Sequence, residues 1–531
     1  MIFNPLEEYE KNFKSLHLEK TKELLENLVK QSNIDIEENR KTIKEIEETE
    51  NIKKTKKKKL GWWKFLRVIL FITLILIPLA IIKINPIIKG IKNDIEELAR
   101  TKVKLQELAT SQMKPLNRLF DKKFCLDLIE SVVPNIKFDK NFTLNQERFM
   151  VNEFDFKEKT SDDQSTINSL AGCYNENPFL FERRTIQYMG TEIYHGYRTI
   201  FWTETYRDSN GRFRTRTRSQ TLHATVAKPK PEYTEKVLLS YCCQAGPELS
   251  FSREAGNVDE KSERQIERHI KKGEKNLKKL TDKAVKDNQN FVSMSNTEFE
   301  VLFNAMNRTN EVQFRTLFTP LAQTNMVDLL LDKEQYGDDF SFIKNKRTSR
   351  IISDHSQGRT LVLYPNVFYS NSYDEIEKNF IEKNQKFFED VYFDFAPLLS
   401  IPIYQEKPMK GLEEYPDLNR QYSYKEYEVL ANKLDEKLIM HEESKTKQII
   451  KCRTIRSNND VDKIVVTAHS FDFIQHTDLI PVFGGDGRVH NVPVVWKEYI
   501  PIEQETEFNV STKELAEGKD ILAEHNDLCI F

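Results

Sequence analysis

The sequence KKTKKKKLGWWKFLRVILFITLILIPLAIIKINPIIKGI, residues 53–91, decides how the chain is organised. Six lysines lie within residues 53–59, followed by Trp62 and Trp63 and then by the apolar run Val68–Ile82. Twelve of the fifteen residues in that run are Val, Ile, Leu or Phe, and residues of this kind favour the bilayer by roughly 4–7 kcal/mol in total. With its flanks the run provides about 20 residues, or roughly 30 Å of helix, which is enough to cross a membrane.

We therefore predict one transmembrane helix, a single-pass protein of the cell membrane, and the lipid bilayer as a partner. The anchor residues expected to contact lipid or headgroups are Trp62, Trp63, Phe65, Val68 and Ile82. A buried core helix is the alternative, but four consecutive lysines rarely precede one. Eight Lys and Arg in residues 53–67, against six in 83–104, weakly favour a cytoplasmic N-terminus. A re-entrant hairpin at Pro78–Pro86 would leave both flanks cytoplasmic, so the topology stays open.

Composition excludes several classes of protein. The chain has 531 residues with 80 basic and 83 acidic side chains, a net charge of −3, so no global field points to nucleic acid or to an acidic substrate. Its six cysteines have neither CxxC pairs nor a regular spacing, which argues against a disulfide framework and a zinc module. A chain of this length has room for two or three domains.

The segments around the apolar run are helical and charged. Residues 1–52 carry an apolar stripe among Glu and Lys, as expected of a helical hairpin or coiled coil. After the predicted anchor in residues 53–91, apolar residues in 92–115 continue a heptad pattern that ends at Pro115. This membrane-proximal helix is expected to self-associate through a coiled coil or to pack on the N-terminal helices. Residues 116–531 form the remaining globular region, with a candidate subdivision near 255–295.

The apolar period changes to two between Pro178 and Arg253, which predicts strands. The β-rich runs Tyr197–Tyr206 and Arg212–Val226 flank Asp208-Ser209-Asn210-Gly211, and Asn-Gly is a strong hairpin signal. We expect prolines 229 and 231 to break the second strand.

Helical and strand patterns alternate through the rest of the globular region. Residues 116–177 are expected to form a mixed, mostly helical bridge, with helix at 116–133 and a polar loop around 160–166. Residues 257–290 and 373–388 are predicted to be helical, and so are residues 297–332 with interruptions near Thr309 and Pro320. Thr297 to Glu300 match a capping box. Strands are predicted at 340–343, 360–364, 447–456, 463–473 and 492–500. The predicted fold class is therefore α+β, with a helical N-terminal region, one transmembrane helix and a globular region that contains antiparallel sheet.

Five phrases resemble a known family: PLNRLFD (115–121), AGPELSFSR (245–253), NRTNEVQFRTLFTPLAQ (307–323), YGDDFSF (336–342) and FDFAPLLSIPIYQ (393–405). Together they are similar to uncharacterised membrane-anchored proteins of low-GC Gram-positive bacteria and mollicutes. The resemblance covers most of residues 115–405. It implies a bacterial membrane protein and no particular activity.

The sharpest candidate site is a ladder of arginines at every second position: Arg212, Arg214, Arg216 and Arg218. Period two places them on one face of a strand. A hairpin loop with an even number of residues would add Arg207 to that face and no acid, whereas an odd loop would add Trp202 and Glu204. These five arginines are a candidate anion-binding strip for phosphate headgroups, nucleic acid or acidic residues of the chain. A solvated sheet face with scattered salt bridges is the alternative.

A second candidate is a scatter of imidazoles and carboxylates, which together suit zinc or manganese: His469, Asp472, His476, Asp478, Asp486 and His490. Their spacing matches no metal site, so we interpret them as surface and turn residues and predict neither a metal nor a cofactor. We interpret Gly484–Arg488 and Tyr336–Asp339 as turns or helix caps.

No recognised catalytic motif is present, so we predict no catalytic residue. The leading hypothesis is a non-enzymatic, membrane-anchored binding or scaffold protein with an unknown protein partner. Binding of anionic lipid through the arginine ladder is an alternative, and binding of nucleic acid is disfavoured. An enzyme whose site is assembled from distant residues is the third possibility.

Overall fold

The computed structural model describes residues 2–72, 83–139, 141–157, 161–287, 292–409, 422–457 and 461–511. The chain divides into two compact units. Unit 1 comprises residues 1–3, 135–361 and 394–531, and unit 2 comprises residues 4–134 and 362–393. Unit 1 contains both sheets of the protein's described residues, whereas unit 2 is helical.

The described residues of unit 2 form helices. They are α1 (Pro5–Glu8), a π-helical segment (Tyr9–Phe13), α2 (Lys14–Ser32), α3 (Ile36–Ile72), α5 (Asn85–Asn117), α6 (Phe124–Val132), a 3-10 turn (Pro365–Val367) and the first part of α12 (Tyr373–Leu399). Apolar side chains of α2, α5 and α12 form one core, which includes Leu25, Met113, Leu116, Ile376 and Phe380. The core forms because each helix places apolar residues three or four positions apart on one face.

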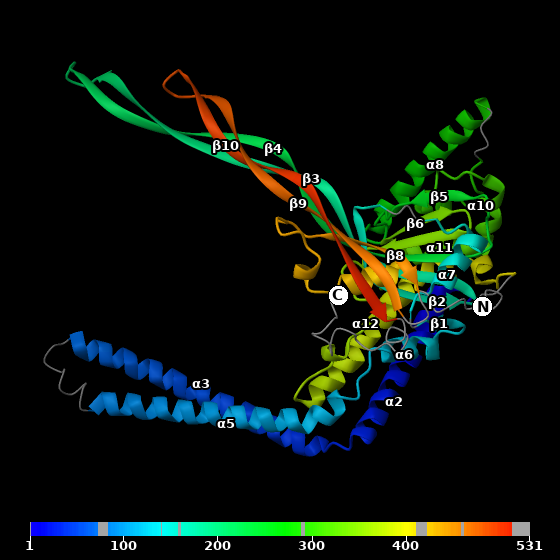
Figure 1. Ribbon diagram of the computed structural model, residues 1–531, viewed down its shortest axis with the longest axis horizontal. Coiled ribbons are helices and arrows are strands. Elements are labelled where there is room, and N and C mark those ends of the chain that lie inside the picture. Colours follow the sequence, from blue (N-terminus) through cyan, green and yellow to red (C-terminus); the bar gives the residue numbers. More distant parts are fainter. Residues whose placement is uncertain are drawn as a thin grey trace. The chain divides into compact units, whose positions relative to one another are not determined.

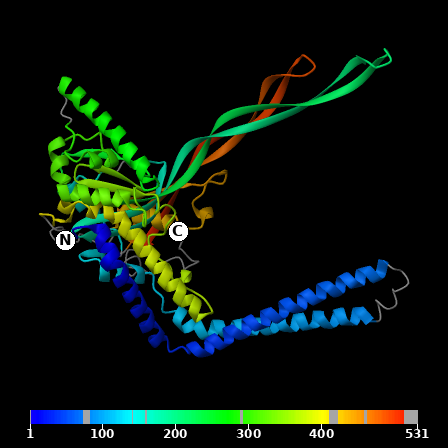
Figure 2. The ribbon, with the colours of Figure 1, turned by 180° about the vertical axis from the view of Figure 1, so that it is seen from behind.

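Helices α3 and α5 form an antiparallel hairpin, and Figures 1 and 2 show them side by side. Lys102 Nζ lies 2.7 Å from Glu50 Oε2, and Lys56 Nζ lies 2.7 Å from Asp94 Oδ2. Nearer the base of the hairpin, the Asn39 side chain donates a hydrogen bond to Gln112 Oε1. The predicted heptad helix thus packs on the N-terminal helices, one of the two arrangements expected from its pattern.

The predicted transmembrane anchor is wrong for the part of the chain that the structure describes. Among those residues no helix is both long and apolar enough to cross a bilayer. Helix α3 is rich in Lys and Glu over most of its 37 residues, whereas a spanning helix needs about 20 predominantly apolar residues in succession. Residues 73–82, which include Ile82, lie outside the described residues. This finding contradicts the prediction of a single-pass membrane protein.

The remaining predicted anchor residues are Trp62, Trp63, Phe65 and Val68, and they lie on α3. The side chains of Trp62, Phe65 and Val68 are exposed. The two tryptophan rings contact each other edge to face, with centroids 5.0 Å apart.

Unit 1 is built on two antiparallel sheets. The first contains seven strands in the order β1-β2-β3-β4-β7-β6-β5, and the second contains three strands in the order β10-β9-β8. The first sheet comprises β1 (Ile136–Phe138), β2 (Gln164–Tyr174), β3 (Asn177–Arg207), β4 (Phe213–Cys242), β5 (Ser250–Arg253), β6 (Phe340–Asn345) and β7 (Thr348–Ser353). The second comprises β8 (Ile449–Ser457), β9 (Val461–Phe483) and β10 (Val489–Ser511).

Unit 1 also contains helices. They are α7 (Leu144–Phe154), α8 (Glu263–Lys286), α9 (Thr297–Phe303), α10 (Glu311–Leu317), α11 (Pro320–Leu331), the end of α12, a 3-10 turn (Pro402–Gln405), α13 (Tyr424–Ala431) and a second 3-10 turn (Glu436–Leu438). A capping box begins α7, because the Thr143 hydroxyl accepts from the backbone of Gln146 and the Gln146 side chain accepts from Thr143 N. The predicted α+β class with antiparallel sheet is confirmed.

Two long β-hairpins, β3–β4 and β9–β10, run alongside each other in both views of the chain (Figures 1 and 2). Ile200 and Leu222 of the first hairpin are buried against Val492 and Val494 of the second. Since a single two-stranded hairpin is at best marginally stable in water, this apolar contact stabilises both. We call the two hairpins together the arm.

Several local predictions need correction. The end of α5 and α6 form the helix expected within 116–133, but β1 and β2 follow it, and β2 begins at Gln164 within the expected loop. Residues 360–364 form no strand, and α12 continues through Pro397 to Leu399. The cap of α9 is Asn296, whose side chain accepts a hydrogen bond from Phe299 N at 3.1 Å, and not Thr297.

Prolines 229 and 231 do not break β4, which continues from Phe213 to Cys242. They pair with Thr191 and Met189 of β3. Because the two prolines are two residues apart, both lack their N–H on the same edge of the strand, and the other edge keeps its hydrogen bonds.

Candidate functional site

The end of the β3–β4 hairpin extends beyond the turn of β9–β10. Gly485 of that turn donates a backbone hydrogen bond to Gln220 Oε1 at 2.7 Å, and a β-carbon at Gly485 would contact the Trp202 ring. Residues 203–217 continue past this point as a two-stranded ribbon, whose end is the farthest part of the arm in both views (Figures 1 and 2). We call residues 201–219 the tip.

Register decides which side chains share each face of the tip. The loop Asp208–Arg212 has five residues, and Arg207 pairs with Phe213. An odd loop was one of the two alternatives, and it places the acid on the arginine side. One face, the arginine face, carries Trp202, Glu204, Tyr206, Arg214, Arg216 and Arg218. The opposite face, the threonine face, carries Phe201, Thr203, Thr205, Arg207, Phe213, Thr215, Thr217 and Ser219.

The arginine face is partly neutralised within the tip. Glu204 Oε2 accepts hydrogen bonds from Arg216 at 2.9 Å and from Arg218 at 2.7 Å. Arg214 Nε donates to Asp208 Oδ2 at 2.9 Å. Since the tip contains five arginines and two acids, its net charge is +3. These exposed ion pairs each contribute less than about 1 kcal/mol to stability.

Hydrogen bonds within the loop also place the acid beside its arginine. Asp208 Oδ1 accepts from the backbone N–H groups of Asn210 and Arg212, both at 3.0 Å. Together with Arg214 these bonds keep the pKa of the Asp208 carboxyl below its ordinary value, the Arg212 amide being the largest cause. Gly211 adopts a φ of +79°, a conformation that glycine takes without strain.

Aromatic side chains accompany the arginines. The Arg216 guanidinium lies over the Tyr206 ring at 5.3 Å, and that of Arg207 lies over the Phe213 ring at 5.6 Å. Phe213 is 77% exposed at the end of the ribbon, and Phe201 is 71% exposed near its start. Exposed aromatics next to arginine are typical of the central residues of protein interfaces.

The five predicted anion-binding residues therefore share the tip but not one surface. Arg214, Arg216 and Arg218 lie on the arginine face, Arg207 lies on the threonine face, and Arg212 belongs to the loop. Sequence reasoning named Trp202 as a neighbour of the arginines but did not single out Phe201, Tyr206 or Phe213. The sequence feature that could have identified these residues is the occurrence of large aromatic side chains within a polar, threonine-rich pair of strands.

The predicted imidazole and carboxylate scatter separates into local pairs along β9 and β10. Four residues pair with different partners: His469 with Glu503 (3.6 Å), His476 with Glu498 (2.7 Å), Asp478 with Lys228 (3.1 Å) and His490 with Asp486 (2.9 Å). In the described ranges no three His, Cys, Asp or Glu side chains gather in a way that could hold a metal ion. Gly484–Arg488 is the turn of β9–β10, in which Gly484 N donates to Arg488 O at 2.8 Å.

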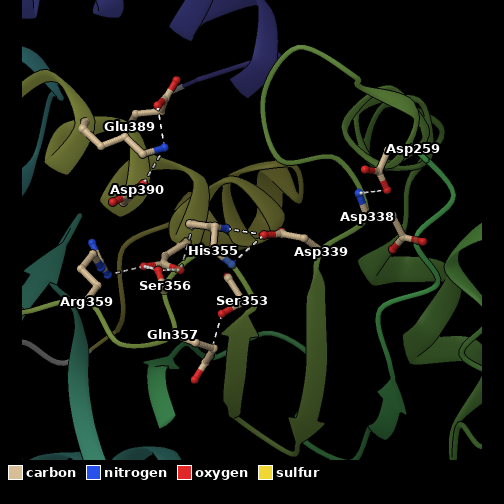
Figure 3. Close-up of polar contacts among 12 residues, drawn as sticks. Asp259, Asp338, Asp339, Ser353, His355, Ser356, Gln357, Arg359, Glu389 and Asp390 are labelled. Atoms are coloured by element: carbon tan, nitrogen blue, oxygen red, sulfur yellow. Dashed lines mark hydrogen bonds and ion pairs between the residues drawn. The ribbon is translucent and has the colours of Figure 1, made fainter. Parts of the chain in front are cut away.

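A polar network in unit 1, which the sequence did not indicate, brings together three distant segments (Figure 3). His355 Nδ1 lies 2.5 Å from Asp339 Oδ2, and its Nε2 lies 3.5 Å from Asp394 Oδ1. Ser356 Oγ lies 2.8 Å from both oxygens of Asp394, and Arg359 Nη2 lies 2.5 Å from Oδ2.

The packing of this network favours a structural role. The Tyr336 ring stacks on the His355 ring with centroids 3.8 Å apart, and the side chains of His355, Asp394 and Arg359 are each less than a tenth exposed. Acid, base and hydroxyl groups occur together, but they bind one another. The network therefore fixes the 353–359 segment between β6 and the end of α12.

Next to it lies a buried ion pair between Arg253 and Asp338. The other Asp338 oxygen accepts from the backbone N–H groups of Gly256 at 3.0 Å and Val258 at 3.2 Å. Burial raises the pKa of Asp338 and lowers the pKa of Arg253, and the attraction between the two charges opposes both shifts. Gly337 makes the predicted turn with a φ of +54°, and Asp338 serves as an ion-pair partner instead of a cap.

Comparison with known proteins adds nothing to this geometry. No protein-family model, no curated protein and no solved structure matches the chain.

Proposed function

We propose that the protein is a non-enzymatic binding or scaffold protein that holds an acidic protein partner at the tip of the β3–β4 hairpin. The observation that carries the proposal is the ribbon of residues 203–217, which continues beyond the end of β9–β10. A ribbon outside the packed part of the arm adds little to folding. Contact between the ribbon and a separate partner molecule explains why the ribbon is so long.

The chemistry of the tip favours an acidic protein over nucleic acid. Arg, Tyr and Trp occur together on the arginine face, and these residue types are enriched at the centres of protein interfaces. A nucleic-acid site would be expected to concentrate uncompensated positive charge. Here Glu204 and Asp208 form ion pairs with three of the five arginines and offset two of their charges, and the whole chain has a net charge of −3.

The non-enzymatic part of the proposal is supported by the polar network. The His355, Ser356 and Asp394 side chains have the chemistry of acid–base catalysis, but they bind one another in the interior of unit 1. A catalytic base must be able to reach a proton of the substrate.

Titration of the full chain with polyglutamate and, separately, with single-stranded polynucleotide tests the proposal. The variant Arg214→Gln/Arg216→Gln/Arg218→Gln should weaken polyglutamate binding at least tenfold. A matched control, Lys271→Gln/Lys275→Gln/Lys278→Gln, removes the same charge from the exposed side of α8 and should leave binding within about twofold of the parent chain. If both variants weaken polyglutamate binding equally, the interaction depends only on the overall charge of the chain, and the proposal is wrong. Polynucleotide bound more tightly than polyglutamate would identify nucleic acid as the partner class instead.

A further inference from the structure

The face of the β9–β10 hairpin that points away from β3–β4 is apolar and exposed. Cross-strand register and the period of two place eight residues on it: Thr477, Leu479, Pro481, Phe483, Val489, Asn491, Pro493 and Val495. Six of these eight residues are apolar and none is charged. The side chains of Leu479, Phe483, Val489 and Val495 are between 45% and 69% exposed. We call these eight residues the outer face.

The opposite face of the same hairpin is also apolar, but it is covered. Val492 and Val494 lie on that face and are fully buried against β3–β4. With apolar residues on both faces, the segments 479–483 (LIPVF) and 492–496 (VPVVW) are unbroken apolar runs. A strand with one face in water usually alternates apolar and polar residues, whereas an unbroken run is typical of a strand that is buried on both faces. The sequence of the hairpin therefore fits a second covering layer on the outer face.

The outward face of β3–β4 has a different composition along the neighbouring part of the arm. Threonines and histidines separate its apolar residues, and the residues there are Thr191, Ile193, His195, Tyr197, Thr199, Thr221, His223, Thr225, Ala227 and Pro229. Ile193 and Tyr197 are as exposed as the side chains of the outer face. Single exposed apolar residues are ordinary on a protein surface, whereas a contiguous apolar patch marks a site of contact. The outer face of β9–β10 is such a patch.

Prolines of β10 favour contact through the outer face over pairing along the edge of the strand. Gly484 N donates to Arg488 O at 2.8 Å, and the ladder alternates from this bond, so Val489 and every second residue after it direct their N–H away from β9. Pro493 and Pro501 occupy two of these positions and have no N–H to donate. A strand added along this edge would lose hydrogen bonds. Packing of one hairpin face on another, which already joins the two hairpins of the arm, has no such cost.

We infer that the outer face binds the outer face of a second copy of this chain across a two-fold axis, which is the commonest symmetry of protein oligomers. Because the face carries no charge, two copies meet on it without bringing like charges together. Interfaces between identical copies are also more apolar than those with separate partners. The two ribbons pack as two sheets do, about 10 Å apart. The tip belongs to the other hairpin, so the inference does not rest on the function proposed for the tip.

Sedimentation velocity of the full chain and of two variants tests the inference. The parent chain should pass from monomer to dimer between about 1 and 100 µM, because mass action sets the dimer fraction and a small apolar contact gives modest affinity. Leu479→Thr/Phe483→Thr keeps residues that favour strands and should raise the dissociation constant of the dimer at least tenfold. The control Ile193→Thr/Tyr197→Thr makes a similar change on the outward face of β3–β4 and should leave that constant within about twofold of the parent value. A parent chain that stays monomeric, or equal effects of the two variants, would overturn the inference.

Photocrosslinking of the full chain tests the geometry of the dimer independently of those variants. A benzophenone amino acid would replace Asn491, which is exposed in the middle of the outer face. Irradiation should give a covalent dimer in which position 491 is joined to residues 477–483 or 489–495 of the second copy. Crosslinks to any other surface of the second copy would contradict the two-fold arrangement. In cells, a product with a different protein in place of the dimer would show that a separate partner covers the face, and the inference would be wrong.

Discussion

Gly196 of β3 and Pro493 of β10 approach so closely that a β-carbon at position 196 would lie 2.2 Å from the Pro493 carbonyl oxygen. The same atom would lie 2.7 Å from a methyl carbon of Val494. Because the nearest obstacle is backbone, a side chain at position 196 would require the two hairpins to separate. Because Gly196 has no side chain, the β3–β4 and β9–β10 hairpins can pack closely against each other.

The first prediction is that Gly196→Ala loosens the arm. We expect a loss of about 1–3 kcal/mol from overpacking, with faster hydrogen exchange in residues 474–500. As a control, Gly90→Ala lies on α5 with nothing within 4 Å of the added carbon, and it should stabilise the chain by about 0.5–1 kcal/mol. Unchanged exchange along β9 and β10 in Gly196→Ala would show that the close contact does not hold the arm together.

A second prediction separates charge from folding at the tip. Glu204→Gln removes the acid that binds Arg216 and Arg218 and raises the net charge of the tip from +3 to +4. Stability should change by less than about 1 kcal/mol, because these pairs are exposed. Polyglutamate affinity, measured by the same titration as for the triple arginine variant, should rise, with a steeper dependence on salt. Weaker binding of polyglutamate by this variant would show that Glu204 itself contributes to binding, and it would contradict the prediction.

The third prediction concerns pH and unit 2. His17 is fully buried on α2 and stacks on Phe388 with centroids 4.3 Å apart, and its Nδ1–H donates a hydrogen bond to Gln385 Oε1 at 3.1 Å. Burial lowers its pKa to about 4 from the ordinary 6.5. The unfolded chain therefore binds the proton first as the pH falls. The stabilisation is complete above pH 6.5 and declines between pH 6.5 and 4, by about 3 kcal/mol in total.

Urea unfolding of the parent chain and of His17→Gln, at pH 7 and at pH 4.5, measures the pH-dependent contribution of His17 to the free energy of unfolding. The parent chain should lose more stability between the two pH values than the variant does, because glutamine does not titrate. Identical pH dependence in the two proteins would contradict a buried neutral imidazole at position 17.

The fourth prediction tests the buried ion pair of unit 1. Asp338→Asn leaves the Arg253 charge without its partner in the interior, which should cost about 3–5 kcal/mol. In Arg253→Met/Asp338→Asn both charges are removed while an oxygen remains for Gly256 N and Val258 N. The double variant should be more stable than Asp338→Asn in urea unfolding. If the double variant is the less stable of the two, the pair does not act as a coupled unit.

Local signals in the sequence predicted the ends of the arm but not its length. The Asn210-Gly211 turn is a property of adjacent residues, and the four arginines have a period that any strand would show. The extent of β3 and β4 depends on burial of Ile200 and Leu222 by Val492 and Val494, nearly 300 residues further along the chain. A sequence pattern that covers only about ten residues gives no information about a contact between residues so far apart in the chain.

Two other differences between the sequence-based predictions and the structure have similar causes. The apolar run after Val68 has the composition of a membrane span, but the described helices on either side are charged and pack on each other. The His355 network joins residues 339, 355 and 394, which share no motif or spacing. Only the tertiary fold brings them together, so the polar residues of Tyr336–Asp339 looked like an ordinary turn.

The central claim is that the tip of the β3–β4 hairpin binds an acidic protein, and site-specific photocrosslinking tests it most directly. A benzophenone amino acid would replace Phe213 at the tip or, as a control, Val312 on α10, since both side chains are about three-quarters exposed. In cells that make the full chain, position 213 should crosslink one predominant acidic protein, and the triple arginine variant should lose that product. Crosslinks that are the same from positions 213 and 312, or that consist of nucleic acid, would contradict the account.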